Sequence, residues 1–141
     1  MAGVVHISEA ANLAIHTMIL MAADVEQPLR VNQAAEVLPV SDNHLAKVLQ
    51  RLGKAGLVTS MRGPQGGFRL ARAAAEITLL QVYEAIEGPL PKATCLLGMP
   101  QCSGNCVLGD FVASANETFR TRLESTRLSD VAGVLKRSKP G

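Results

Sequence analysis

The sequence predicts a mainly α-helical protein with one small β-hairpin, and two observations support that prediction. Apolar residues recur at three- and four-residue intervals in segments that follow helix-capping residues, notably Ser8, Ser41 and Thr78. Residues 57–71 form two short strand-like runs separated by a turn rich in glycine. With 141 residues and a hydrophobic content of 48%, the chain can build one compact domain with a protruding element.

Two helices are expected in the first forty residues. Ser8 can cap a helix that continues to about Ala23, and its apolar residues on most sides predict a buried scaffold helix. A shorter helix is expected from Asn32, as its N-cap, to about Leu38, because Pro39 would stop it. A third helix after this turn would complete a helix-turn-helix.

The third helix, capped by Ser41 and ended by Gly56, occupies the recognition position of such a motif. Its apolar residues fall on one stripe: Leu45, Val48, Leu49 and Leu52. Its outer face carries amide, imidazole and basic groups: Asn43, His44, Lys47, Gln50, Arg51 and Lys54. Such groups can reach base edges in a major groove, although a plain solvated helix would show the same pattern.

Two predicted strands, Leu57–Met61 and Phe68–Ala71, follow this helix and are joined by the turn RGPQGG at residues 62–67. A helix followed by a basic-tipped hairpin predicts a winged helix-turn-helix. The glycines would leave backbone amides open to phosphate, and arginines would add charge. A nucleotide-binding P-loop is disfavoured because no Lys-Ser or Lys-Thr follows the turn. The candidate DNA-binding residues are Ser41, Asn43, His44, Lys47, Arg51, Arg62, Gly63, Pro64, Gly66, Gly67 and Arg69.

Positive charge is concentrated in this segment. Residues 41–72 contain six basic residues and one acidic residue, a net charge of +5 in a chain whose total is +2. The aromatic content is only 3%, with no Trp, which leaves few side chains for stacking single-stranded bases. Double-stranded DNA is therefore the expected nucleic-acid partner.

The last third of the chain predicts a capped helix, a loop and a long amphipathic helix. Thr78 and Gln81 form a capping box for a helix to Glu87, which Gly88 and Pro89 stop. Residues 107–127 form the long helix, whose apolar positions are Leu108, Phe111, Val112, Ala115, Phe119 and Leu123. We expect this stripe to pair with a second copy as a homodimer, with packing onto its own domain as the alternative.

The expected domain organisation has four parts. Residues 1–90 form the winged helix-turn-helix domain, 91–107 a cysteine-containing loop, 108–128 the dimerisation helix, and 129–141 a short helix and tail. Ser129 is the expected cap of the short helix, which continues to Leu135, and the basic tail from Lys136 is expected to be loose. No signal peptide or membrane span is recognised, so the expected location is the cytoplasm.

Three cysteines, Cys95, Cys102 and Cys106, lie within twelve residues of an irregular, glycine-containing loop. An odd number in so short a window fits poorly with a secreted disulfide framework, and favours metal binding or redox sensing. Three thiolates on such a loop can converge on one centre. Structural zinc would need a fourth strong ligand, and the loop offers none.

The run HLAKVLQRLGKAGLVTSMRGPQGGFRL, the helix LLQVYEAIEG, the three cysteines and the long terminal helix resemble the IscR/NsrR family of bacterial winged-helix regulators. The similarity extends from about Ile7 to Val131, and the wing pattern R-G-P-x-G-G-F-x-L is its most specific part. The resemblance implies a homodimer on a palindromic operator, with each recognition helix in a major groove and each wing at the adjacent minor groove. Family members with three cysteines in this loop hold an iron-sulfur cluster.

The resemblance implies that Cys95, Cys102 and Cys106 ligate such a cluster, although their spacing departs from that of the best-known members, so 2Fe-2S and 4Fe-4S both stay open. No histidine follows Cys106, and some members take a carboxylate from the first helix of the partner subunit at the position of Asn12 here. Asn12 and Glu9 are therefore the candidate fourth ligands, and His6 and Asp110 are further candidates within reach.

The expected function is a DNA-binding transcriptional regulator, acting as a repressor, whose cluster senses nitric oxide, iron or redox state. One alternative is a cluster-free regulator of the same family that responds to thiol oxidation or a small molecule. Another is an iron-sulfur electron-transfer or accessory protein on the same scaffold. No nucleophile, base and orienting residue can be assembled from the sequence, so neither an enzyme nor a small-molecule substrate is expected.

Overall fold

The computed structural model describes residues 5–64, 66–90 and 107–137. In chain order the elements are α1 (Glu9–Ala23), α2 (Val31–Val37), α3 (Asp42–Lys54), β1 (Val58–Met61), β2 (Gly67–Leu70), the 3₁₀ turn η1 (Ala74–Glu76), α4 (Leu79–Glu87), α5 (Val107–Ser125) and α6 (Leu128–Val131). The expected fold class, mainly helical with one small hairpin, is confirmed. Within the described residues, no helix is both long enough and apolar enough to cross a bilayer.

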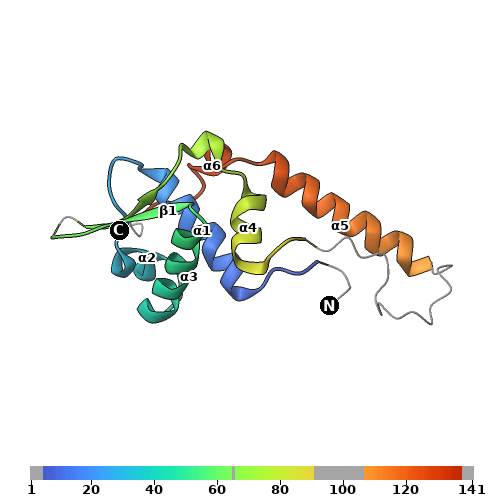
Figure 1. Cartoon of the computed structure of the whole chain (residues 1–141), viewed down its shortest axis with the longest axis horizontal. Helices are drawn as coiled ribbons and strands as arrows, with labels where there is room; N and C mark the ends of the chain where they lie inside the picture. The colour runs from blue at the N-terminus through green and yellow to red at the C-terminus, as the bar shows by residue number, and fades with distance from the viewer. Residues whose placement is uncertain (1–4, 65, 91–106, 138–141) are drawn as a thin grey trace.

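The molecule is elongated, with the hairpin at one end and the start of α5 at the other (Figure 1). Helices α1 to α4 form a compact body beside the hairpin, and α5 extends away from it as a single long helix. After α5, the chain returns to the body, where α6 packs against η1 and α1. The N-terminal end of α5, which follows the cysteine loop in sequence, therefore lies far from the wing.

Helix α1 is the central scaffold, as its apolar composition predicted. Ser8 caps it by accepting a hydrogen bond from the Ala11 amide at 3.0 Å. Met18, Leu20 and Met21 lie among the largest fully buried side chains of the protein. Helices α3, α4 and α6 all pack against α1, so α1 holds these three helices together.

Helix α3 has the predicted cap, stripe and end. The Ser41 hydroxyl accepts a hydrogen bond from the His44 amide at 3.2 Å, and Gly56 adopts a φ of +77° after the last turn. The stripe of Leu45, Val48, Leu49 and Leu52 is buried. Burial of one face leaves the opposite face of α3 toward solvent.

The hairpin has a third backbone partner that the sequence did not predict. Strands β1 and β2 are antiparallel, with Val58 opposite Leu70 and Met61 opposite Gly67. On the other side of β2, Leu29 and Phe68 exchange two backbone hydrogen bonds of 2.8 Å each. The wing is thus a two-stranded sheet held against the connection between α1 and α2, residues 24–30, called the α1–α2 loop below.

Two predicted helix starts are wrong. Helix α2 begins after Arg30, whose amide donates to the side chain of Gln33 at 3.1 Å, and Asn32 lies inside the helix. Helix α6 likewise begins after Arg127, whose amide donates to Asp130 Oδ2 at 2.8 Å, rather than after Ser129. In both cases a side chain three residues further along accepts the N-cap amide, and this places the cap earlier than the serine or asparagine suggested.

The prediction of a loose tail is also wrong at its first residues. Arg137 donates hydrogen bonds to backbone carbonyls at the end of α1 and in the α1–α2 loop. The C-terminal segment is therefore docked on the body at this point.

Candidate nucleic-acid interface

The outer face of α3 presents several of the predicted DNA-binding residues to solvent. Asn43 and Lys47 are exposed, and His44 is half-buried one turn into the helix. The Lys47 side chain makes no hydrogen bond or ion pair to any residue that the structure describes. Ser41 is exposed too, but its hydroxyl already serves the helix cap. An amide and a free ammonium on the first turns of an exposed helix can contact bases and phosphates.

Arg51, on the same helix, is engaged elsewhere. Its guanidinium donates a hydrogen bond to the carbonyl oxygen of Ile86, in the last turn of α4. Carbonyls in the last turn of a helix lack partners within the helix, and a cation near them is favoured by the helix dipole. Arg51 therefore joins the recognition helix to α4, a role that its position in the sequence did not suggest.

The turn of the wing is closed by its own backbone. The Gly66 amide donates to the Gly63 carbonyl at 2.8 Å, and Gly63 has a φ of +98°. The amide of Gly66 is thus occupied, which corrects the expectation that every glycine of the turn leaves its amide open to phosphate. A guanidinium nitrogen of Arg30 donates to the Pro64 carbonyl and ties the turn to the start of α2. Arg62 is exposed at the end of β1.

The backbone of strand β2 packs so closely against the α1–α2 loop that no side chain fits between them at Gly67. A Cβ atom added at Gly67 would lie 2.7 Å from the carbonyl oxygen of Leu29, and Gly67 has a φ of +150°. Arg69, a predicted phosphate contact, is half-buried and donates to the Glu26 carbonyl at 2.9 Å. Arg69 and Gly67 therefore hold the wing in place.

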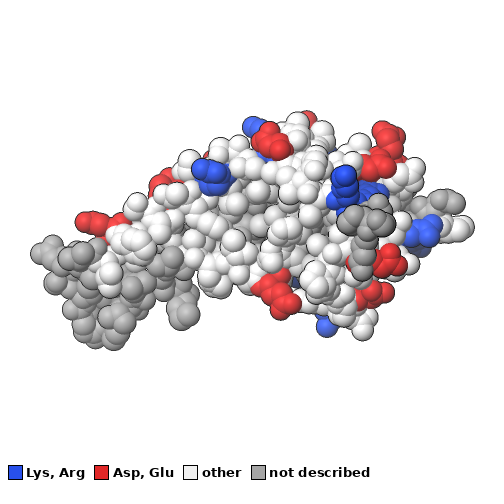
Figure 2. Space-filling model, turned by 180° about the vertical axis from the view of Figure 1, so that it is seen from behind, with Lys and Arg blue, Asp and Glu red and all other residues white. Residues whose placement is uncertain are grey.

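Basic side chains on or beside α3 and the wing, together called the reading end below, differ in their partners. Arg30, Arg51 and Arg69 hold backbone carbonyls, whereas Lys47 and Arg62 have no hydrogen-bond or ion-pair partner among the described residues. On the face opposite to that of Figure 1, acidic and basic side chains are interspersed among uncharged residues (Figure 2). Sequence charge alone could not separate the two groups, because the carbonyl partners come from distant segments.

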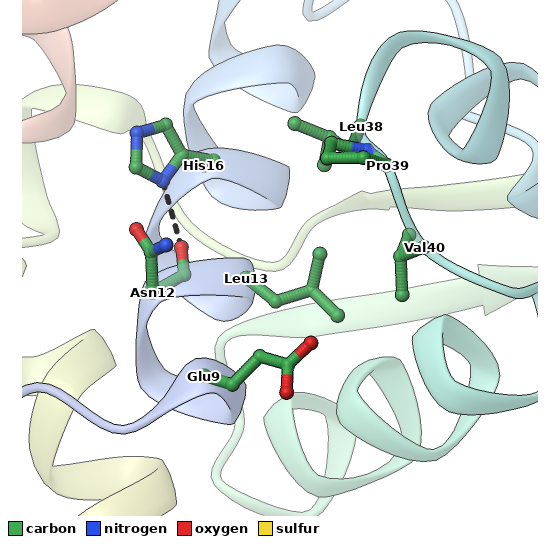
Figure 3. A pocket seen from close by; sticks show the side chains of 7 residues that line it. All are labelled: Glu9, Asn12, Leu13, His16, Leu38, Pro39 and Val40. Atoms are coloured by element: carbon green, nitrogen blue, oxygen red, sulfur yellow. Dashed lines mark hydrogen bonds between the residues drawn. The ribbon is translucent and has the colours of Figure 1, made fainter.

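The candidate fourth ligands lie together on one side of α1. Glu9 and Asn12 line a cavity of about 230 Å³ together with His16, and the turn before α3 forms its apolar wall (Figure 3). The His16 Nδ1 lies 2.7 Å from the Asn12 carbonyl oxygen. The described residues contain no group of three or more His, Cys, Asp or Glu that could hold a metal. Cys95, Cys102 and Cys106 lie outside the described residues.

The residue at the base of the cysteine loop is held from two sides. The Leu90 amide donates to Glu84 Oε2 at 3.0 Å, and the Leu90 carbonyl accepts from Arg120 Nη2 at 3.1 Å. Leu90 itself is buried. This clamp connects α4 and α5 where the loop begins, and the sequence contained no signal for it.

The predicted dimerisation stripe divides into two halves. Phe119 packs edge-on against Tyr83 of α4 with ring centroids 5.4 Å apart, and Leu123 belongs to the core of the same chain. Val112 is buried and Ala115 is half-buried. Leu108 and Phe111, near the start of α5, are 51% and 62% exposed. The alternative of packing on its own domain therefore holds for the C-terminal half of α5.

A helix-turn-helix whose second helix is followed by a β-hairpin wing defines the winged helix-turn-helix class of DNA-binding proteins. The profile of the Rrf2 family, described as iron-dependent transcriptional regulators, matches residues 7–133, and the chain belongs to this family. It is also 33% identical to Protein aau3 of Rhizobium meliloti (strain 1021) over 128 residues, which cover 89% of this chain and 83% of that protein.

Solved structures share this fold. CymR (YrzC), the global cysteine regulator of B. subtilis, superposes with a TM-score of 0.80 at 24% identity, covering 93% of this chain and 98% of that one. T. potens IscR superposes with a TM-score of 0.72 at 26% identity, covering 89% and 85%. The winged-helix fold and the family resemblance read from the sequence are thereby confirmed.

Proposed function

We propose that this Rrf2-family transcriptional regulator binds a palindromic operator as a homodimer and acts as a repressor. Helix α3 enters the major groove, and the wing contacts the adjacent backbone. The observation that supports this most directly is that Lys47 on α3 and Arg62 on the wing are exposed and without partners in the described residues. Leu108 and Phe111 supply the exposed apolar surface for the second copy.

The test begins with selection of duplexes from a random-sequence pool on the purified protein. Lys47→Ala and Arg62→Ala should weaken binding to the selected duplex, and the loss of one phosphate contact should reduce the slope of affinity against salt by about one. Arg122→Ala is the matched control, because Arg122 is exposed in the last turn of α5 and belongs to neither α3 nor the wing. Failure to enrich any duplex, or equal losses for all three variants, would contradict operator binding.

We further propose that Cys95, Cys102 and Cys106 hold an iron-sulfur cluster. Three thiols in one short loop are the donor set that such clusters use, and Asn12 and Glu9 are the candidates for the fourth position. When bound, the cluster supplies iron that reacts with nitric oxide or oxidants and that is lost when iron is scarce. Contacts within the chain connect Leu90, which precedes the cysteine segment, to α3. Leu90 is hydrogen-bonded to α4 and α5, and α4 in turn accepts a hydrogen bond from Arg51 of α3.

Anaerobic purification tests the cofactor. The protein should be coloured, Ala at any of the three cysteines should abolish the visible absorbance, and Mössbauer spectroscopy should distinguish 2Fe-2S from 4Fe-4S. Affinity for the selected duplex should differ between the loaded and cluster-free protein. A colourless protein without iron after anaerobic reconstitution would contradict the cluster, and equal affinities would contradict the switch.

A cluster-free regulator is the second candidate, because the fold is shared with CymR, which is described as a global cysteine regulator. In that case the colourless protein would still bind the duplex, and its affinity would change with thiol oxidation or with an added small molecule. An electron-transfer role would instead show reversible one-electron chemistry without specific DNA binding in either state.

A further inference from the structure

The C-terminal end of α1 is completed by a residue from the opposite end of the chain. The last turn of α1 contains no basic residue, and its carbonyls need partners from outside the helix. Arg137 supplies them: its guanidinium donates to the carbonyls of Leu20 at 3.0 Å, Asp24 at 2.6 Å, Met21 at 3.3 Å and Pro28 at 3.4 Å. One side chain thereby joins the end of α1 to the α1–α2 loop.

The same loop carries the wing on its other side. Leu29 pairs with Phe68 of β2 through two hydrogen bonds of 2.8 Å, and Arg69 of β2 donates to the Glu26 carbonyl at 2.9 Å. Gly67 passes so close that a Cβ atom would lie 2.7 Å from the Leu29 carbonyl oxygen. A displacement of the loop would therefore displace β2 with it.

The chemistry of this contact requires arginine. A guanidinium presents five N–H donors in a rigid plane, which allows one side chain to reach four carbonyls in different directions. A lysine ammonium has the same charge but only one donor atom, so it cannot span them. Burial lowers the pKa of Arg137, the negative charge of Asp24 opposes that shift, and the guanidinium remains charged at neutral pH.

We infer that Arg137 is a positioning residue for DNA binding: it fixes the α1–α2 loop and, through that loop, the orientation of the wing. It does so without touching DNA. The expected change in DNA affinity rests on the proposed function. The expected change in hydrogen exchange rests only on the contacts above.

The first experiment compares Arg137→Ala, Arg137→Lys and Lys136→Ala in the full chain. The probe is a fluorescent duplex selected by the wild-type protein from a random-sequence pool. Because Arg137 no longer fixes the α1–α2 loop that carries the wing, both Arg137 variants should bind about tenfold more weakly, with the salt slope unchanged. Lys136 is exposed and adjacent, so its substitution controls for the loss of a nearby positive charge and should leave affinity unchanged.

Two outcomes of this experiment would overturn the inference. Wild-type affinity in Arg137→Lys, or a salt slope lowered by about one in Arg137→Ala, would mean that the charge itself contacts phosphate. Wild-type affinity in a fully folded Arg137→Ala protein would mean that the contact serves stability alone.

The second experiment needs no DNA. Hydrogen exchange should speed up at the amides of Leu29 and Phe68 in both Arg137 variants, while the amide of Leu49 in α3 serves as an internal reference for global stability. Unchanged protection at Leu29 and Phe68 would overturn the inference. If the wild-type protein enriches no duplex, the proposed function fails, and this experiment still decides the role of Arg137.

Discussion

Gly67→Ala is the substitution that most directly tests how the wing is held. An alanine Cβ at this position would lie 2.7 Å from the carbonyl oxygen and 3.0 Å from the carbonyl carbon of Leu29. These are backbone atoms, which cannot rotate out of the way as a flexible side chain can. Strand β2 must therefore move off the α1–α2 loop.

The cost follows from the contacts that would be lost. Separation of Leu29 from Phe68 breaks two backbone hydrogen bonds of 2.8 Å, each contributing about 1 kcal/mol net. The φ of +150° at Gly67 adds about 1 kcal/mol for a residue with a side chain. The total is about 3 kcal/mol, a large fraction of the ~5–15 kcal/mol that stabilises a typical domain. It should lower the melting temperature by about 10 °C.

Two other glycines supply matched controls. Gly63 has a φ of +98° but open space around it, so Gly63→Ala carries only the conformational cost of about 1 kcal/mol. Gly133 also has open space and no unusual φ, so Gly133→Ala should be neutral within about 0.5 kcal/mol. Urea unfolding of the three variants and hydrogen exchange at Phe68 give the comparison.

The result that would refute this reasoning is a Gly67→Ala protein that matches Gly63→Ala within about 0.5 kcal/mol and keeps wild-type protection at Phe68. In that case β2 would tolerate a side chain against Leu29, and the close approach would not hold the wing.

Three further substitutions test separate contacts. Lys47→Ala should weaken DNA binding and lower the salt slope by about one without changing the free energy of unfolding, as measured by titrations at several salt concentrations; an unchanged affinity would remove Lys47 from the interface. Arg51→Ala removes the hydrogen bond to the Ile86 carbonyl that joins α3 to α4, so DNA affinity should fall while the salt slope stays unchanged. A slope lowered by about one would instead mean that Arg51 contacts a phosphate. Tyr83→Phe removes the 2.8 Å hydrogen bond from the hydroxyl to the His6 carbonyl and should cost about 1 kcal/mol. Burial raises the pKa of Tyr83 above 10.0, and the nearby carboxylates add to the shift. The stability that the Tyr83 hydroxyl contributes is therefore complete below pH 10.0 and is lost as the pH rises further. The urea midpoint of Tyr83→Phe should lack this decline at high pH.

The features that the sequence predicted correctly depend on neighbouring residues. Ser8, Ser41 and Thr78 each accept a hydrogen bond from the amide three residues ahead, so their pattern is visible in a short window. The buried stripe of α3 follows from helical periodicity in the same way. The two wrong helix starts show the limit of this approach. Asn32 and Ser129 are good capping residues, but the helices begin earlier, where the side chains of Gln33 and Asp130 accept the amides of Arg30 and Arg127.

The predicted DNA contacts stay a prediction, and the structure shows which of their side chains are available to a ligand. Charge and turn composition placed the reading end at residues 41–72, and Lys47 and Arg62 are available there. Arg51 and Arg69 have the same chemistry in the sequence, but their guanidinium groups hold the carbonyls of Ile86 and Glu26. Whether an arginine faces solvent or a carbonyl depends on which backbone the fold brings beside it.

By itself, the sequence determined the elements of a winged helix, because caps, periodicity and turns are local properties. It also supplied the candidate DNA contacts and the three thiols proposed as cluster ligands. Only the tertiary structure decided how the wing is supported. Leu29 pairs with Phe68, and Arg137 closes the end of α1 across more than a hundred residues of chain. Backbone carbonyls are present at every residue and leave no mark in the sequence, so their partners become known only when the chain is folded.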